Sequence, residues 1–198
     1  MKQEKFETFC ADGVKLSGLL LIPEKPKAVI QFNCGTATKK EFYLKFLTYL
    51  TENGYLCCLW NYRWTNESDN LKNRDLSYID YGIKDMPGIK SYLDKRFPHL
   101  PFMLIGHSVG GQQIGFMNNL DNVVGNINIA VSSGYWLYMP FKYRMRAYFF
   151  FYVFSPLSAL VYGYIKAKPY GFMENLPTKF VLEWRKWLGQ KDLFLSEK

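Results

Sequence analysis

One stretch of the chain, FMLIGHSVGGQQ, restricts the possible folds more than any other part of the sequence. It begins with an apolar run at residues 102–106, which predicts a buried strand. A Gly-x-Ser-x-Gly motif follows at 106–110, and residues 109–120 have helical character. Such a motif is typical of a strained turn between a strand and a helix, where the positions two before and two after the serine leave no room for side chains. The stretch therefore predicts a strand, a sharp turn that presents Ser108, and a helix.

Strand and helix patterns alternate around this motif. Alternating hydrophobic residues on both sides of Asp12-Gly13 predict a β-hairpin. Four apolar runs, separated by segments with helical spacing, predict strands at residues 28–33, 55–60, 102–106 and 126–131. Strands that alternate with helices and are apolar on both faces form a parallel sheet covered on both sides. We therefore expect an α/β fold with a mostly parallel, doubly wound sheet.

Two of the expected helices carry signals at their ends. Residues 38–41, Thr-Lys-Lys-Glu, form a capping box that predicts a helix start, and Gly54 predicts where this helix stops. Its expected buried face consists of Phe42, Phe46, Leu47 and Leu50. In the next helical pattern, residues 79–93, Pro87 predicts a kink or a fresh helix start.

The composition fits one globular domain. A chain of 198 residues that is 48% hydrophobic and 21% charged can bury a core and shows no sign of disorder. The N-terminus has no apolar stretch before a cleavage site, so we expect no signal peptide and a cytoplasmic protein. The four cysteines lack the spacing of a zinc site, and the adjacent Cys57 and Cys58 cannot easily pair. We expect reduced thiols, no metal and no cofactor.

The net charge of +8 is spread unevenly along the chain. No run of five basic residues occurs, which argues against nucleic acid as a partner. The asymmetry lies in residues 122–173, which contain no acid. The basic residues of the acid-free segment that stand out are Lys142, Arg144, Arg146, Lys166 and Lys168.

The pattern changes after residue 133. Residues 135–172 hold fifteen aromatic residues, and residues 147–165 form an uncharged stretch of 19. A membrane span needs about 20 apolar residues, but the Ser-Pro-Leu-Ser sequence at 155–158 is expected to break the stretch. Three interpretations remain open: a helical cap packed over the sheet edge, a cap that also touches membrane or lipid, and a true span. We assign 1–133 to the sheet core and 134–190 to a helical, aromatic-rich cap.

A serine nucleophile for acyl transfer needs nearby N–H groups that can bind an oxyanion. One candidate is the backbone N–H of Val109, which follows the serine at the start of a helix. The other is the N–H of Gly35, because glycine lets the backbone after the first parallel strand approach a substrate oxygen. Ser108, Val109 and Gly35 are therefore the candidate site residues.

At these positions the chain resembles the α/β-hydrolase superfamily, and within it the serine aminopeptidase-like and monoacylglycerol lipase-like branch. The resemblance covers essentially the whole chain. Four segments carry it: QFNCGTATKKEFY as the oxyanion loop, NYRWTNES as a second loop, FMLIGHSVGGQ as the nucleophile turn and SSGYWLYMP as the lead into the cap. The resemblance implies that Ser108 is the nucleophile and that Gly35 and Val109 supply the oxyanion N–H groups.

The chain also departs from the pattern of this branch. Its oxyanion loop reads Asn-Cys-Gly at residues 33–35, where the branch has His-Gly-x or Asn-Gly-x. In the second loop, Arg63 and Ser68 match the branch. Three positions of that loop do not match, with Asn61, Trp64 and Asn66 in place of an aspartate and two glycines.

A catalytic base is harder to find. His99 precedes the strand that leads to Ser108, which places it about 16 Å away at the wrong end of the sheet. His107 is adjacent to the serine, and neighbours across such a turn point apart. None of the later acids stands at a catalytic position of the family: Asp121, Glu174, Glu183, Asp192 and Glu197. We therefore expect a C-terminally truncated hydrolase that lacks the last strands and hydrolyses esters poorly or not at all.

Two functional hypotheses follow. The first is a serine hydrolase that cleaves an ester or other acyl bond of a small, fairly apolar substrate through an acyl-enzyme on Ser108. Peptidase, thioesterase and lipase chemistry all stay open. The second is a non-catalytic protein of the same shape that binds lipid or a membrane surface through the basic, aromatic residues 135–172.

Overall fold

The structure, a computed structural model, describes residues 1–36, 38, 41–63 and 75–191. The described residues group into two compact units. The first unit comprises residues 1–63 and 79–131, and it contains the sheet. The second comprises residues 75–78 and 132–191, and its main elements are helices.

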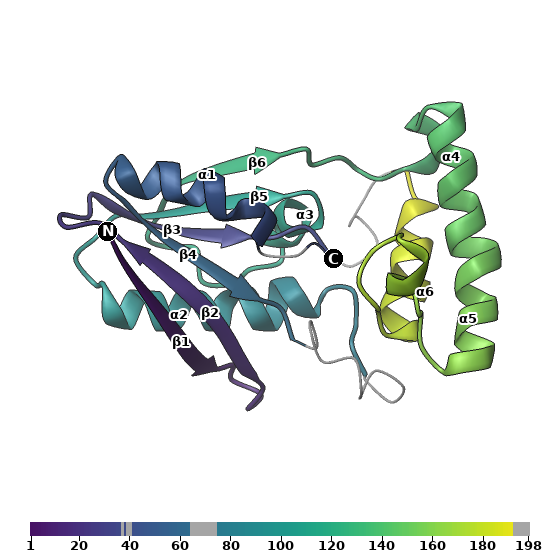
Figure 1. The fold of residues 1–198 in the computed structure, drawn as a ribbon, viewed down its shortest axis with the longest axis horizontal. Helices are drawn as coiled ribbons and strands as arrows, with labels where there is room; N and C mark the ends of the chain where they lie inside the picture. Colours follow the sequence, from purple (N-terminus) through teal and green to yellow (C-terminus); the bar gives the residue numbers. More distant parts are fainter. Residues whose placement is uncertain (37, 39–40, 64–74, 192–198) are drawn as a thin grey trace. The chain divides into compact units, whose positions relative to one another are not determined.

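Six strands form one sheet in the order β1-β2-β4-β3-β5-β6 (Figure 1). Strands β1 and β2 form the predicted antiparallel hairpin, and β2 pairs antiparallel with β4. The pairs β3–β4, β3–β5 and β5–β6 are parallel. The mostly parallel α/β sheet predicted from the sequence is thereby confirmed. The strands are β1 (Lys2–Phe9), β2 (Lys15–Ile22), β3 (Ala28–Asn33), β4 (Tyr55–Asn61), β5 (Phe102–His107) and β6 (Val123–Ile129).

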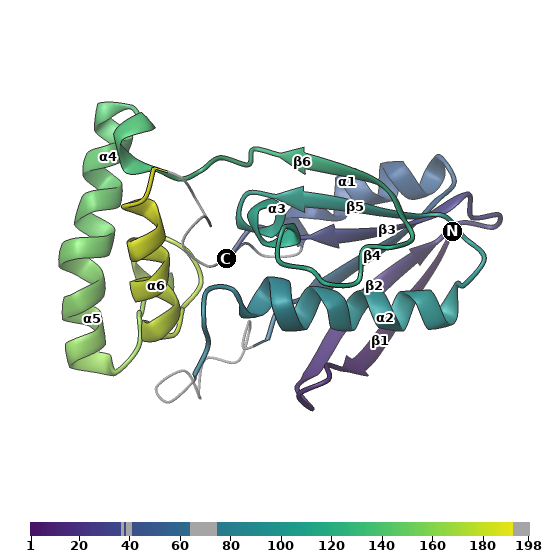
Figure 2. The same ribbon diagram turned by 180° about the vertical axis from the view of Figure 1, so that it is seen from behind.

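Helices cover both faces of the sheet. Figures 1 and 2 show α1 (Glu41–Glu52) on one face and α2 (Met86–Arg96) on the other. Between β5 and β6 lies α3 (Val109–Ile114), which is shorter than the helix to about residue 120 that the sequence suggested. All six residues of β3 are buried, as expected for a central strand covered on both sides.

The buried face of α1 differs from the expected one. Phe42 is 73% exposed and Phe46 is also exposed, whereas Tyr43, Leu47 and Thr51 are buried. The i, i+4 spacing of these three residues places them on one side of the helix. The Tyr43 hydroxyl, at the start of this face, forms hydrogen bonds inside the unit. This face of the helix therefore turns inward, although the opposite face is apolar. The capping box at 38–41 lies partly outside the described residues.

A π-helical turn precedes α2. This turn, η2 (Tyr81–Asp85), ends with a bond from the N–H of Met86 to the carbonyl of Tyr81, five residues back. Pro87 then occupies the first turn of α2, where a missing N–H costs little. The sequence predicted a kink or a fresh helix start at Pro87; α2 begins one residue before this proline, directly after the π-turn, and the backbone is helical across the junction.

The four cysteines, Cys10, Cys34, Cys57 and Cys58, are all buried free thiols. Burial raises the pKa of Cys10 and of Cys34 to about 12, and that of Cys57 to about 11. Burial also raises the pKa of Cys58. The prediction of reduced thiols that act as small hydrophobic groups agrees with this placement.

The second unit is built around a long helical run. Two α-helices, α4 (Phe141–Tyr148) and α5 (Ser155–Tyr162), are joined by the π-helix η4 (Phe149–Phe154), and the backbone at both junctions is helical. The expected break at Ser155–Ser158 is therefore wrong. The proline at 156 stands in the first turn of α5, directly after the π-turn, where its ring and missing N–H are tolerated.

The core of this unit is aromatic. Helix α6 (Thr178–Leu188) packs Phe180, Trp184 and Trp187 around Tyr78, and Trp184 also meets Phe151 of η4 edge to face. The remaining short elements are the 3-10 turns η3 (Trp136–Tyr138) and η5 (Lys168–Tyr170). Within the described part of the chain, every helix is too short or too polar to cross a membrane.

Candidate active site

The turn at Ser108 has the strained backbone that its sequence predicts. Ser108 has φ 52° and ψ −122°, a region that residues with a side chain rarely adopt. Its N–H donates to the carbonyl of Ile129 at 3.0 Å, and its own carbonyl accepts from Gly111 and Gln112 as α3 begins. The strain is therefore supported from both sides, by β6 and by the helix.

The glycines on either side of Ser108 are sterically required. A Cβ on Gly106 would lie 2.4 Å from the Cα of Gly111, and one on Gly110 would lie 2.2 Å from the carbonyl oxygen of Asn33. Backbone atoms cannot yield at these distances, so no side chain fits at either position. This close packing brings the start of α3 directly against the end of β3.

The two predicted oxyanion donors follow neighbouring strands. In the register of β3 and β5, Asn33 pairs with Gly106, so the loop after β3 and the turn after β5 start side by side. Val109 is the first residue of α3, and its N–H has no acceptor within that helix. The structure thus places Gly35 and Val109 at the same edge of the sheet as Ser108, although their role as donors stays a prediction.

The N–H of Gly35 already has a partner that the sequence did not reveal. It donates to the hydroxyl oxygen of Tyr43 at 3.0 Å, and this hydroxyl lies 2.9 Å from Nδ1 of His107. A Cβ on Gly35 would lie 2.7 Å from the same Nδ1, so the imidazole packs directly on the glycine. Tyr43, 4% exposed, therefore links the loop after β3 to the residue before Ser108.

This network also defines what His107 can do. The Tyr43 oxygen accepts from Gly35 and lies 2.9 Å from Nδ1 of His107, so this ring nitrogen is engaged with tyrosine in either imidazole tautomer. Burial lowers the pKa of His107, which favours the neutral imidazole. With its Nδ1 engaged and its ring packed on Gly35, His107 braces the loop after β3 against the turn at Ser108.

Neither the other histidine nor the later acids complete a triad within the described residues. His99 lies between α2 and β5, before the end of β5 that is remote from Ser108. Glu174 pairs with Lys168, and Glu183 accepts from Ser77 and from the N–H of Tyr78. Asp121 precedes β6, at the start of that strand. Asp192 and Glu197 lie outside the described residues, as do Trp64, Asn66 and Ser68 of the second loop.

Arg63, the described residue of that loop that matches the family pattern, belongs to a buried charge cluster. Its backbone N–H and its Nε both donate to Asp85, which is fully buried, and its Nη1 donates to Asp12 at 2.7 Å. Burial raises the pKa of Asp85 to about 6. Arg63 thus ties the β1–β2 turn to η2, and η2 in turn supports α3, since Gly82 N–H donates to the side chain of Gln113.

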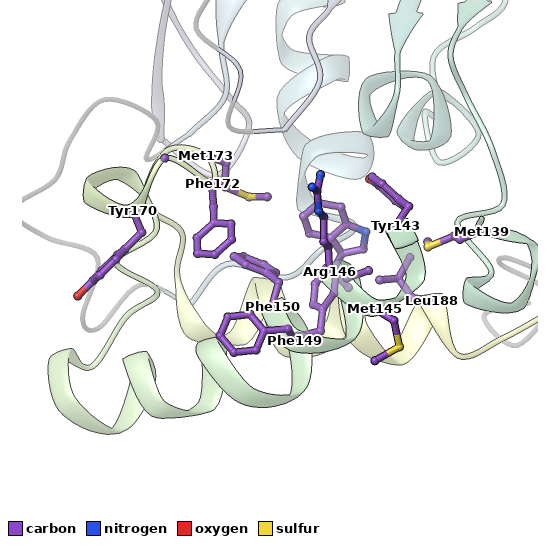
Figure 3. A pocket seen from close by; sticks show the side chains of 14 residues that line it. Met139, Tyr143, Met145, Arg146, Phe149, Phe150, Tyr170, Phe172, Met173 and Leu188 are labelled. Carbon is purple, nitrogen blue, oxygen red and sulfur yellow. The ribbon is translucent and has the colours of Figure 1, made fainter. Parts of the chain in front are cut away.

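The second unit contains a pocket of its own, of about 670 Å³. Its lining is mostly aromatic and sulfur-containing, with Arg146 as its cation (Figure 3). In Figure 3, Phe150 and Phe172 lie on one side of the Arg146 side chain and Tyr143 on the other. The arrangement suits an apolar molecule with a negatively charged or polar end. Among the described residues, no group of histidine, cysteine and carboxylate side chains could hold a metal ion.

Strand order, the strained serine between two required glycines, and the helix that follows define an α/β-hydrolase fold. The chain belongs to the family described as serine aminopeptidase, S33, which matches residues 24–131. No curated protein matches the chain.

Solved structures agree with this fold at low sequence identity. An esterase from Pyrococcus furiosus has a TM-score of 0.56 and 18% identity, over 71% of this chain and 57% of its own. A thermostable carboxyl esterase from Bacillus coagulans has a TM-score of 0.64 and 12% identity, over 95% and 73%. The α/β hydrolase GrgF from Penicillium has a TM-score of 0.57 and 16% identity, over 94% and 74%. The chain thus spans little more than half the length of the Pyrococcus esterase.

Proposed function

We propose that this chain carries the nucleophile of a serine hydrolase that cleaves an ester or other acyl bond of a small, fairly apolar substrate. The observation that supports this most is the positive φ of Ser108 between two glycines that admit no Cβ. Backbone strain of this kind costs on the order of 1–3 kcal/mol and persists where a function needs it. A tight turn without catalytic purpose could use glycine at position 108 and avoid that cost.

In the proposed reaction, Ser108 Oγ attacks the acyl carbon and the carbonyl oxygen becomes an oxyanion. The N–H of Val109 donates to this oxyanion at the start of α3. Gly35 supplies the second N–H once its bond to Tyr43 is exchanged for one to the substrate oxygen. The alcohol leaves with the proton that the base took from Ser108, and water then releases the acyl group as the carboxylic acid and restores the serine hydroxyl.

This reaction requires a base that takes the proton of Ser108, and neither histidine of the 198 residues is placed to do so. Without a base the serine stays a neutral alcohol, and only the acceleration by oxyanion N–H groups is left. We therefore expect these residues alone to hydrolyse activated esters slowly.

A fluorophosphonate probe tests the proposal directly. Protein expressed from its natural gene is incubated with the probe, and its intact mass and peptide map are measured. We expect one adduct, which forms slowly on Ser108 because no base among these residues activates it, and which is absent in Ser108→Ala. The matched control is Ser132→Ala, which removes an exposed serine and should leave the adduct unchanged. An adduct that persists in Ser108→Ala contradicts the proposal. Esterase activity of Ser108→Ala that equals the activity of the wild type contradicts it as well.

The second candidate is a non-catalytic protein with the hydrolase fold that binds lipid. It is favoured by the neutral His107, whose Nδ1 is occupied by Tyr43. No adduct on Ser108, together with binding of a fatty acid by the pocket around Arg146, would support this alternative over the first.

A further inference from the structure

The long helix of the second unit exposes a continuous apolar surface. We call it the apolar stripe; its members are Met145, Phe149, Val153, Leu157, Leu160 and Val161, all exposed. The exposed fractions reach 83% at Leu160 and 70% at Val161. Steps of three and four residues place these side chains along one side of the helix. Contiguous apolar surface of this kind marks an interaction site more often than chance exposure.

The opposite side of the same helix already serves as core. Phe150 and Phe151 are buried, and they meet Phe172 and Trp184 edge to face. Ser158 is buried as well, where it donates to the carbonyl of Tyr164 and accepts from the N–H of Lys166. The helix therefore has one side packed within its unit and another that lies open.

Basic residues flank the stripe, and the segment of sequence that carries it contains no acid. Lys142 and Arg146 are exposed in α4, at the N-terminal end of the stripe. Lys166 lies just past its C-terminal end, with its ammonium 4.5 Å from the centre of the Tyr162 ring. Residues 122–173 contain no aspartate or glutamate. The segment that carries the stripe is thus basic, and the described acids of the same unit are engaged elsewhere: Glu174 pairs with Lys168, Asp75 pairs with Lys179, and Glu183 accepts from Ser77 and Tyr78.

Tyrosine and tryptophan side chains line one margin of the stripe. Tyr148 and Tyr152, both partly exposed, stack on each other with ring centres 4.8 Å apart. Tyr148 also stacks on Trp136. These amphipathic rings favour the boundary between water and lipid, where one edge is apolar and the other hydrated.

We propose that the apolar stripe docks on the surface of a membrane that contains anionic lipids, with the helix lying in the plane of the interface. The stripe enters the boundary between head groups and acyl chains, and the flanking lysine and arginine side chains contact the negatively charged head groups. A second copy of the chain fits this surface less well, because two acid-free basic surfaces would face each other and repel. The proposal does not depend on Ser108, so it stands or falls separately from the proposed hydrolase activity.

Vesicle flotation of the full 198-residue chain tests this docking. Vesicles of phosphatidylcholine alone are compared with vesicles that also contain phosphatidylglycerol, at low and at high salt. We expect binding to the anionic vesicles at low salt, and a loss of at least about tenfold at high salt or without the anionic lipid. Ser108→Ala should bind as the wild type does.

Two pairs of matched variants separate charge from apolar burial. Lys142→Gln with Lys166→Gln, which leaves Arg146 and its pocket intact, should weaken binding about tenfold or more, whereas Lys186→Gln with Lys191→Gln, equal in charge but on and after α6, should not. Leu160→Ser with Val161→Ser should weaken binding about tenfold at either salt concentration. Phe42→Ser with Val124→Ser, similarly exposed residues of the first unit, should leave it unchanged.

Hydrogen exchange supplies a second readout that does not rely on variants. Amides of residues 141–162 should exchange more slowly when anionic vesicles are present, and those of β6 should not change. Equal binding by the stripe variants and the wild type would overturn the proposal. Sedimentation that shows a dimer broken by Leu160→Ser with Val161→Ser, without vesicle binding, would assign the stripe to self-association and also overturn it.

Discussion

Each unit contains a π-helical turn that ends with the same kind of backbone hydrogen bond, but the two turns place different kinds of side chains. In η2 the N–H of Met86 bonds the carbonyl of Tyr81, and in η4 the N–H of Ser155 bonds that of Phe150. In both, a proline occupies the first turn of the helix that follows. The extra residue in each π-turn changes the backbone hydrogen-bond pattern just before the proline, which has no N–H to donate.

The side chains of the two turns differ. Three of the five residues of η2 are buried, among them Asp85, which binds Arg63. In η4, only Phe150 and Phe151 are buried, and Phe149, Tyr152 and Val153 are exposed. The same π-turn can therefore hold a buried charged side chain in one unit and place apolar side chains on the surface in the other. Substitutions in η2 should therefore lower the free energy of unfolding strongly, and most substitutions in η4 should lower it little.

The largest difference is expected for Asp85→Ala. It leaves the buried guanidinium of Arg63 without its main partner, which should lower the free energy of unfolding by about 3–5 kcal/mol. Val153→Ala in η4, at an exposed position, should change it by less than about 0.5 kcal/mol. Urea denaturation measures both, and equal costs would contradict the contrast.

Gly82→Ala tests how closely η2 packs on the helix that follows Ser108. The new Cβ would lie 2.4 Å from the carbonyl oxygen of Gln113, so we expect a loss of about 3 kcal/mol. Gly115→Ala is the control, because Gly115 has a helical backbone and its nearest contact would be at 3.7 Å. If both variants unfold at the same urea concentration, the contact of η2 with α3 is looser than described.

The titration of Asp85 gives a pH-dependent effect. Its pKa is about 6 in the folded protein, above the ordinary 3.8, because burial disfavours the carboxylate. Between these values the folded protein binds the proton more tightly than the unfolded chain does. Stability from this group is therefore full below about pH 4 and is lost as the pH rises to about 6, on the order of 3 kcal/mol in all.

Asp85→Asn removes this titration, so the stability difference between wild type and variant should fall across the same pH window. A difference that rises with pH would show that Arg63 outweighs burial and holds the pKa of Asp85 low. Denaturation at several pH values between 3 and 7 distinguishes the two outcomes.

The smallest effects are expected for Pro87→Ala and Pro156→Ala. Each replacement gives the unfolded chain more freedom, which costs about 0.4–1 kcal/mol. Each also restores an N–H in the turn after the π-turn, and slow exchange of that amide would show that it has joined the helix. A loss well above this range at either position would mean that the proline ring itself is needed for packing.

Much of the sheet and of the turn at Ser108 could be predicted because local sequence dictates them. Apolar runs specify the buried strands. Gly106 and Gly110 specify the turn, because a side chain at either position would collide with the backbone. The inward face of α1 could not be predicted in this way. Tyr43 turns inward because its hydroxyl bonds Gly35 and His107, which come from two other segments of the chain. Hydrophobicity alone favoured the exposed Phe42.

The long helix of the second unit shows the opposite error. The sequence at 155–158 suggested a break, because proline and serine are poor helix residues. The helix continues through the π-turn before it, in which Phe150 and Phe151 are buried. The proline and serine residues alone therefore gave a wrong prediction, because the residues before them also determine whether the helix continues.

The burial of the four thiols has a consequence for the covalent chemistry of the chain. Thiols with pKa values of about 11 or higher, such as Cys34 and Cys57, carry almost no thiolate at neutral pH and react slowly with oxidants and alkylating reagents. The folded protein should keep the same covalent structure in oxidising and in reducing surroundings. A cysteine placed on its surface would then be the reactive thiol for a fluorescent or spin label.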